Sequence, residues 1–242
     1  TIIGEWDAAM QPEHDIEGLD LPPGPAVSHA ENLAFLAALR GEPERAWAVL
    51  AAVEPVRASI EDARAEGARL LLESQMLALE GRLGAAYETA MEGASRTDPY
   101  VFPNSLWAAR VALWRGDREG AKAPLEINLA IPVQGRFVDA NRLVLEAGVR
   151  AIGGETDGAL AAYRECLRHF QALEMPFPRS MALMEAGTLL DPAIPAVAAY
   201  AAEARAQIER LGSPPLLARL DAMLEARAAS AGSSAEGTIR RR

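Results

Sequence analysis

The chain has 242 residues, of which half are apolar and only 5% aromatic, and its net charge is −10. Fifty residues are Ala, which favours closely packed helices and excludes an all-β fold. The negative charge argues against a general nucleic-acid surface, and a single cysteine excludes a disulfide framework. The sequence has neither an apolar run as long as a membrane span nor a signal-peptide pattern. We expect a cytoplasmic protein that contacts neither nucleic acid nor membrane.

A six-residue pattern recurs along the chain and predicts helical hairpins. It reads Gly, acid, any residue, acid, any residue, Ala. Full copies begin at Gly4, Gly41, Gly116 and Gly154, and weaker copies begin at Gly81 and Asp191. The starts are 35 to 40 residues apart, a spacing typical of stacked helical repeats. Gly can end one helix in the left-handed conformation, and acids favour the start of the next helix, because its free N–H groups attract negative charge.

Apolar residues at helical spacing fill the intervals between these turns. They predict helices over residues 27–40, 43–54, 61–80, 83–96, 104–115, 117–129, 137–152, 156–171, 177–190, 193–211 and 214–228. A small residue stands seven positions before four of the turn glycines, which allows two helices to approach closely; these residues are Ala34, Ser74, Ala109 and Ala147. Pro124 should kink or shorten its helix, because proline removes a backbone hydrogen bond.

Together these patterns predict an all-α fold, a right-handed superhelix (α-solenoid) of about six helical hairpins over residues 1–228. Each hairpin is amphipathic and hides its apolar face against the next one. Residues 229–242 lack apolar periodicity and are expected to form a disordered tail. Gly4 occupies a turn whose preceding helix is missing, so the first hairpin is incomplete. We therefore expect the chain to be the C-terminal fragment of a longer protein.

The pattern resembles the tetratricopeptide repeat, in which Gly is followed by Ala five residues later and preceded by a small residue. Tyr163 and Tyr200, four residues after the Ala, fit that family, although its usual period is about 34 residues. The longer period is similar to the maltose-regulator type of superhelix, found C-terminally in bacterial multidomain nucleotide cyclases, signalling ATPases and LuxR-type regulators. Residues 162–176 and 208–212 are similar to the last repeats of those proteins. The chain has no helix-turn-helix domain after the superhelix, which favours the cyclase-like or ATPase layout.

This resemblance implies that the superhelix serves in ligand sensing, partner binding or autoinhibition. The first helix of each hairpin would then line a concave groove. The expected groove residues are Glu31, Phe35, Gln75, Arg110, Asn141 and Glu185. The expected partner is a protein segment or another domain of the same polypeptide. Alanine at Phe35 or Arg110 should weaken partner binding without lowering the melting temperature.

The sequence lacks the usual motifs of catalysis: it has no phosphate loop, dinucleotide fingerprint or zinc helix. Cys166, Trp107 and Trp114 are expected in the core. We therefore predict a non-catalytic interaction or regulatory module with no cofactor or metal. Two alternatives stay open. A small-molecule sensor domain of a transcriptional regulator would have a partly apolar pocket at the bend of the superhelix, and an all-α enzyme would have acid–base residues converging in one cavity.

Overall fold

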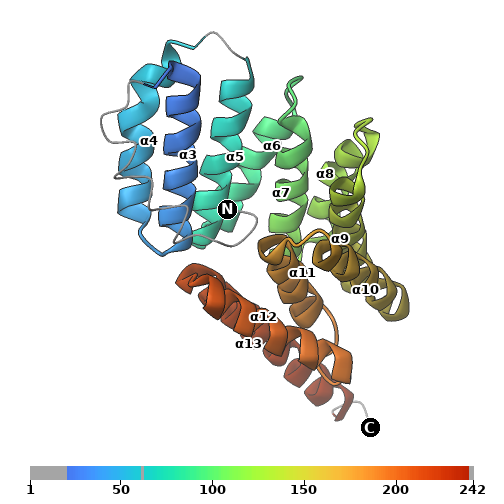
Figure 1. Ribbon diagram of the computed structural model, residues 1–242. Coiled ribbons are helices and arrows are strands. Elements are labelled where there is room, and N and C mark those ends of the chain that lie inside the picture. Colours follow the sequence, from blue (N-terminus) through green and yellow to red (C-terminus); the bar gives the residue numbers. More distant parts are fainter. Residues whose placement is uncertain (1–20, 61–62, 240–242) are drawn as a thin grey trace.

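The computed structural model describes residues 21–60 and 63–239, with the backbone alone at residue 63 and from residue 230 onward. This part of the chain forms eleven α-helices and no strand, so the predicted all-α fold is confirmed. The helices are α3 (Pro23–Leu39), α4 (Pro43–Ala58), α5 (Ala63–Leu79), α6 (Leu83–Ala94), α7 (Val101–Trp114), α8 (Arg118–Ala130), α9 (Arg136–Ile152), α10 (Thr156–Ala172), α11 (Pro176–Leu189), α12 (Pro195–Leu211) and α13 (Pro214–Ile239) (Figure 1).

Helices that follow one another in the chain also lie against one another. The most extensive contacts join α3 with α4, α5 with α6, α6 with α7, α7 with α8, α9 with α10, and α11 with α12. The small residues before the turns, Ala34, Ser74, Ala109 and Ala147, are all buried. The Ser74 hydroxyl donates to the Ala86 carbonyl at 2.6 Å, which joins a side chain of α5 to the backbone of α6. A larger side chain at this position would hold the two helices apart.

Four turns share one geometry, which a glycine makes possible. The φ angles are 81°, 82°, 69° and 82° at Gly41, Gly81, Gly116 and Gly154. In each turn the N–H of the residue after the glycine donates to the carbonyl five positions earlier, with an N···O distance of 2.9 Å. This hydrogen bond closes the end of the helix and reverses the chain. The turn at Gly4 lies outside the described residues.

The acids that follow these glycines act less uniformly than the pattern predicts. The Asp117 carboxylate caps α8 by accepting from the backbone N–H of Gly120 at 2.8 Å. Glu42 and Glu155 occupy the equivalent positions before α4 and α10 but make no capping hydrogen bond. Asp is a strongly preferred capping residue and Glu is not, because the longer Glu side chain places its oxygens poorly for these N–H groups.

The sixth predicted turn, at Asp191, is built without glycine. Helix α11 ends at Leu189, and Leu190 after it is extended. Large Met184 stands where the other pairs have a small residue, and the close approach of α11 to α12 occurs at Gly187 instead. A Cβ added to Gly187 would lie 2.6 Å from the backbone nitrogen of Ala201. The last pair thus keeps a close helix contact but moves it along the helix.

Helix α8 is not shortened at Pro124 and continues to Ala130, close to the predicted bounds 117–129. Proline has no N–H to donate to the carbonyl four residues earlier, which here belongs to Gly120. The hydroxyl of Tyr87, on α6, donates to this carbonyl at 3.0 Å. A neighbouring hairpin therefore supplies the hydrogen bond that the proline removes.

Two other helices run further than the sequence indicates. Helix α4 passes through Pro55 and ends at Ala58, four residues beyond the predicted 43–54. Helix α13 extends to Ile239, into the predicted tail 229–242. The segment from 229 to 239 contains no proline and several alanines, so nothing in its sequence forces the helix to end.

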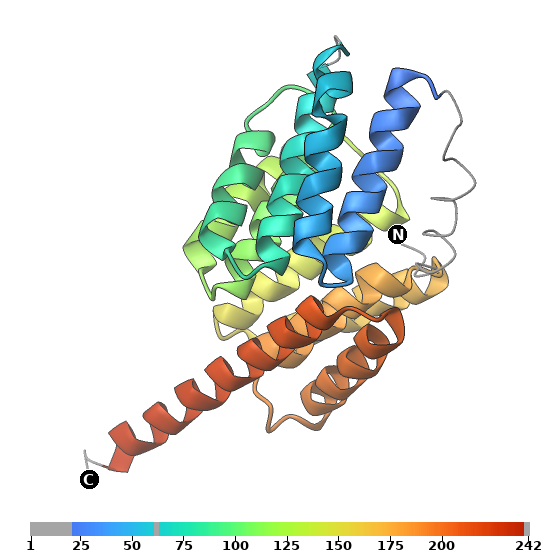
Figure 2. The same ribbon diagram turned by 90° about the vertical axis from the view of Figure 1, so that its left-hand side faces the viewer.

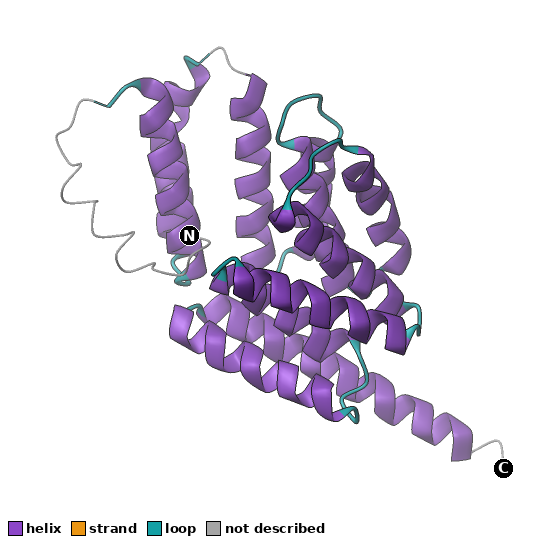
Figure 3. Ribbon diagram, turned by 45° about the vertical axis from the view of Figure 1, so that its right-hand side comes forward, coloured by secondary structure: helices purple, strands orange, loops and turns teal. Residues whose placement is uncertain are grey.

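The last three helices cross one end of the first ones. Figure 1 and Figure 2 show α12 and α13 beneath α3 and α5, with the end of α13 leading away from the other helices. Helix α13 contacts both α3 and α5, and Arg40 donates to the carbonyl of Gly212 at 3.3 Å. Figure 3 shows the same crossing from another side. Residues far apart in the sequence are therefore brought together at this junction.

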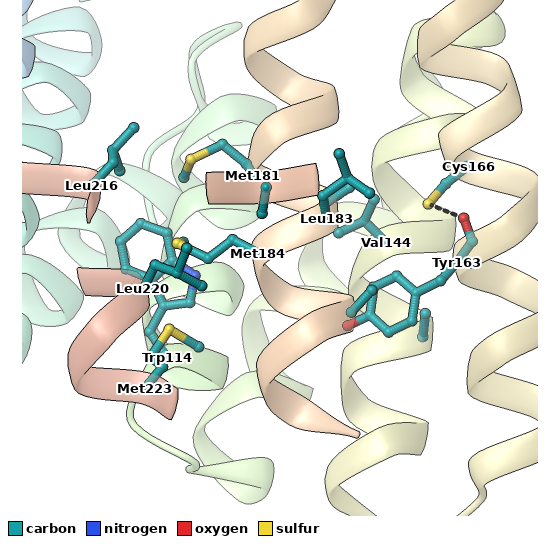
Figure 4. Packing of buried hydrophobic residues seen from close by; sticks show 14 of the residues in the cluster. Trp114, Val144, Tyr163, Cys166, Met181, Leu183, Met184, Leu216, Leu220 and Met223 are labelled. Carbon is teal, nitrogen blue, oxygen red and sulfur yellow. Dashed lines mark hydrogen bonds between the residues drawn. The ribbon is translucent and has the colours of Figure 1, made fainter. Parts of the chain in front are cut away.

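Helix α11 lies at the centre of the core. All its residues from 180 to 188 are buried, so it is covered around its whole circumference. Figure 4 shows apolar side chains of α7, α9, α10 and α13 meeting those of α11; one labelled residue from each of the four helices is Trp114, Val144, Tyr163 and Leu220. The first-hairpin residue Phe35 also reaches α11, with its ring 6.2 Å from that of Phe177.

Candidate functional site

The structure divides the six predicted groove residues into two groups. Three are partly exposed, namely Glu31, Phe35 and Gln75, and three are buried, namely Arg110, Asn141 and Glu185. The amide of Asn141 donates to the Phe137 carbonyl at 2.8 Å within α9, so its polar group is used inside the fold. The buried three do not form an open surface in this conformation.

Arg110 on α7 and Glu185 on α11 form an ion pair inside the core. Arg110 Nε lies 2.6 Å from Glu185 Oε1, and the two side chains are 6% and 0% exposed. The indole N–H of Trp114 donates to the same oxygen at 3.2 Å. Burial raises the pKa of Glu185 above its ordinary value, and the positive charge of Arg110 opposes that effect. The pair joins helices 75 residues apart, so replacing Arg110 by alanine should lower stability, contrary to the expectation from sequence.

The only cysteine of the chain lies beside this pair and is a packing residue. The Cys166 thiol donates to the Tyr163 carbonyl at 3.1 Å within α10 (Figure 4). Burial raises the pKa of Cys166 to about 12, and the nearby Glu185 carboxylate adds to this effect. The thiol is therefore protonated and unreactive at neutral pH. Trp107 and Trp114 are also buried, with ring centroids 5.5 Å apart.

An open cleft of 580 Å³ lies between α3 and α5, and we call it the α3–α5 cleft. Several small, apolar side chains line the cleft, among them Val27, Ala65 and Ala68. Among the described residues, Glu31 is the one carboxylate that lines it, and Arg64 lines it as well. Phe35, one turn further along the same face of α3, packs on Phe177 at the start of α11, so the cleft borders the buried core.

Glu31 is the charged group of the α3–α5 cleft whose carboxylate has no described partner. It is partly buried and makes no hydrogen bond or ion pair with the described residues. Burial raises its pKa above the ordinary value, while the nearby Arg57 acts in the opposite direction. Arg57 is itself paired with Glu54. The Glu31 carboxylate is therefore available to a donor from outside the described structure.

A second cleft, of 680 Å³, lies where the chain turns from α10 into α11 and meets α12; we call it the α10–α12 cleft. Its lining combines apolar and polar side chains, including Phe170, Met175, Arg179, Glu203 and Gln207. Arg179 and Glu203 form an ion pair of 2.6 Å across it. The turn contains Glu174 with φ of 53°, the one described non-glycine residue with a positive φ. No sequence pattern pointed to this cleft, because its lining comes from three helices with ordinary residues.

Comparison of the chain with protein-family models, with curated proteins and with solved structures gave no match. Across the described ranges, no group of three or more His, Cys, Asp or Glu side chains is placed to hold a metal ion. None of the described helices combines the length and the apolar character that crossing a membrane requires. The two clefts and the buried ion pair are the features from which function is inferred.

Proposed function

We propose that this chain is a non-catalytic protein-interaction module of a bacterial signal-transduction protein, with a cyclase-like or signalling-ATPase layout, in the cytoplasm. Its fold is proposed to be a tetratricopeptide-like, right-handed superhelix of about six hairpins, the first one incomplete. Four turns of one geometry and five consecutive helix pairs support the repeat architecture. The parent protein and its compartment rest on the sequence resemblance alone. The partner is a protein segment or another domain of the same polypeptide.

The single observation that carries the interaction role is Glu31 in the α3–α5 cleft. A carboxylate that loses part of its water without gaining a donor costs free energy, and a bound segment that supplies a donor recovers it. A Lys or Arg side chain, or backbone N–H groups, would supply that donor. Val27, Ala65 and Ala68 offer apolar surface beside it. The cleft therefore fits a short peptide in which a basic residue stands next to an apolar one.

Selection from a phage-displayed library of random dodecapeptides tests this role, with the full chain as bait. Enriched peptides should carry Lys or Arg, and their synthetic forms should bind the chain in fluorescence anisotropy. Glu31→Gln should weaken that binding about tenfold or more, because the lost hydrogen bond is charge-assisted. Glu88→Gln is the matched control, since it makes the same charge change on an exposed position of α6. Equal affinities of the two variants would contradict the proposal.

A second candidate function is small-molecule sensing, and the α10–α12 cleft is the observation that favours it. Its volume lies within the range of about 300–1,000 Å³ that small-molecule sites occupy, and it contains both charges of the Arg179–Glu203 pair. A metabolite screen by thermal shift tests this function. A ligand should raise the melting temperature of the wild type and raise that of Gln207→Ala less, because Gln207 lines the cleft.

A further inference from the structure

A third cleft lies on the junction between the last helix and the turns after α7 and α9, and we call it the Trp114 cleft. Its volume is 330 Å³. Apolar side chains form much of its wall, namely Trp114, Ile152, Leu189 and Met223. Two arginines, Arg115 and Arg227, also line it. None of these residues belongs to the α3–α5 cleft, so a role of the Trp114 cleft is independent of the role proposed for Glu31.

The arginines of the Trp114 cleft are not paired with any carboxylate in the part of the chain that the structure describes. Most described arginines are paired with a carboxylate or bonded to carbonyls, whereas Arg115 and Arg227 form no ion pair with the described residues. The Arg115 guanidinium lies 5.6 Å from the Tyr87 ring centroid, which holds the group in place without neutralising it. Two arginines without an ion pair thus line one cleft of a protein whose net charge is −10, although the carboxylates of Asp117 and Glu88 lie near Tyr87 as well.

A third arginine, outside the lining of the cleft, lies over the ring of Trp114. The Arg219 guanidinium lies 6.0 Å from the centroid of Trp114, and like the other two arginines it has no carboxylate partner among the described residues. Burial lowers the pKa of Arg219, and no acid counters that effect. A partly buried, unneutralised cation strengthens the attraction of an anion to the same place, because the field is screened less there than in water.

We propose that the Trp114 cleft binds an acidic peptide segment of a partner protein. Carboxylates of the segment pair with Arg115 and Arg227, whose planar guanidinium groups match carboxylate geometry. An apolar side chain between those acids packs on Leu189 and Met223 at the cleft wall. The apolar wall favours a peptide over nucleic acid, and the overall charge of −10 opposes binding of a long polyanion.

Helix α13 creates this surface by crossing the ends of α7, α9 and α11. Arg219 and Arg227 are two turns apart on α13, and Met223 lies between them. Arg115 follows directly after α7. The recognition groups therefore converge only when α13 is packed in place, and the binding of an acidic segment depends on that packing.

The proposal is tested by selection from the same phage-displayed dodecapeptide library, again with the full chain as bait. The acidic peptides among those selected are the ones analysed for this cleft. Peptides with at least two acids flanking an apolar residue should be enriched. A synthetic copy of an enriched acidic peptide should bind the double variant Arg115→Gln/Arg227→Gln about three- to tenfold more weakly than it binds the wild type. The effect is modest because an ion pair at an exposed edge of a binding site contributes little. The matched control is Arg164→Gln/Arg210→Gln, which makes the same charge change at exposed positions of α10 and α12 and should leave affinity unchanged.

Further measurements decide between ligand classes. Replacing the apolar residue of the peptide by Ser should weaken binding, and raising the salt concentration should weaken it as well. The proposal is overturned if no acidic peptide is enriched, or if the two double variants bind the peptide equally. It is also overturned if single-stranded DNA or phosphatidylserine vesicles bind the wild type more tightly than the peptide does. Circular dichroism of both double variants checks that they are folded.

Discussion

Removing one partner of the buried ion pair should destabilise the protein strongly, whereas removing both should not. Glu185→Ala leaves the Arg110 guanidinium in the core without a counter-ion, and it also leaves the Trp114 N–H without its acceptor. Breaking a buried pair in this way costs about 3–5 kcal/mol, out of the roughly 5–15 kcal/mol that holds a typical domain folded. The double variant Arg110→Met/Glu185→Leu removes both charges and keeps apolar volume. The Trp114 N–H still lacks its acceptor in this variant, at a cost of about 1–3 kcal/mol, which offsets the gain of up to about 4 kcal/mol expected from replacing a buried ion pair by apolar groups. The free energy of unfolding of the double variant should therefore lie close to that of the wild type.

Urea unfolding followed by far-ultraviolet circular dichroism measures both effects. Glu88→Ala, on the exposed face of α6, is the control and should change the free energy of unfolding by no more than about 0.5 kcal/mol. The reasoning fails if Glu185→Ala loses less than about 1 kcal/mol, because the pair would then be solvated. It also fails if the double variant is as unstable as Glu185→Ala, because the loss would then come from packing or from the unsatisfied Trp114 N–H and not from an unpaired charge.

Four further predictions concern individual residues. Tyr87→Phe should lower the free energy of unfolding by about 0.5–1.5 kcal/mol in urea titrations, because the Gly120 carbonyl opposite Pro124 loses its donor; an unchanged value would mean that water replaces the hydroxyl. Gly187→Ala should lower the free energy of unfolding by about 1–3 kcal/mol, and with it the melting temperature, because the added Cβ would meet the backbone of Ala201. Gly84→Ala in α6, where a Cβ meets nothing within 4 Å, should instead stabilise by about 0.5–1 kcal/mol. Finally, the pKa of Glu31 is raised in the folded protein, so the Glu31 carboxylate binds a proton more tightly in the folded state than in the unfolded chain. The contribution of Glu31 to stability should therefore fall as pH rises from the ordinary carboxyl pKa through the raised one, and Glu31→Gln should remove this dependence; parallel curves for wild type and variant would refute it.

Local structure was predictable where a residue acts on its immediate neighbours in the chain. Gly41, Gly81, Gly116 and Gly154 end helices because only glycine adopts the left-handed conformation at no cost, and this requirement is visible in the sequence. The small residues before them are buried because paired helices approach there. The effect of Pro124 was not predictable in this way, because the hydrogen bond that preserves α8 comes from Tyr87, on a different hairpin.

The candidate sites depended far more on tertiary structure. Sequence spacing could place Arg110 and Glu185 on the first helices of two hairpins, but it could not reveal that they face each other at 2.6 Å in the core. The Trp114 cleft was equally invisible, since Arg115 and Arg227 lie more than a hundred residues apart and meet only where α13 crosses the other helices.

By itself, the sequence determined that the chain is helical and where most helices begin and end. Those properties arise from interactions within a few residues, whose energies do not depend on the distant chain. Tertiary structure alone decided that α11 is buried on every side, that half of the predicted groove residues lie in the core, and where arginines gather without acids. The angle at which the last three helices cross the first ones decides these features, because small changes in helix packing add up along the chain to large changes in which surfaces meet.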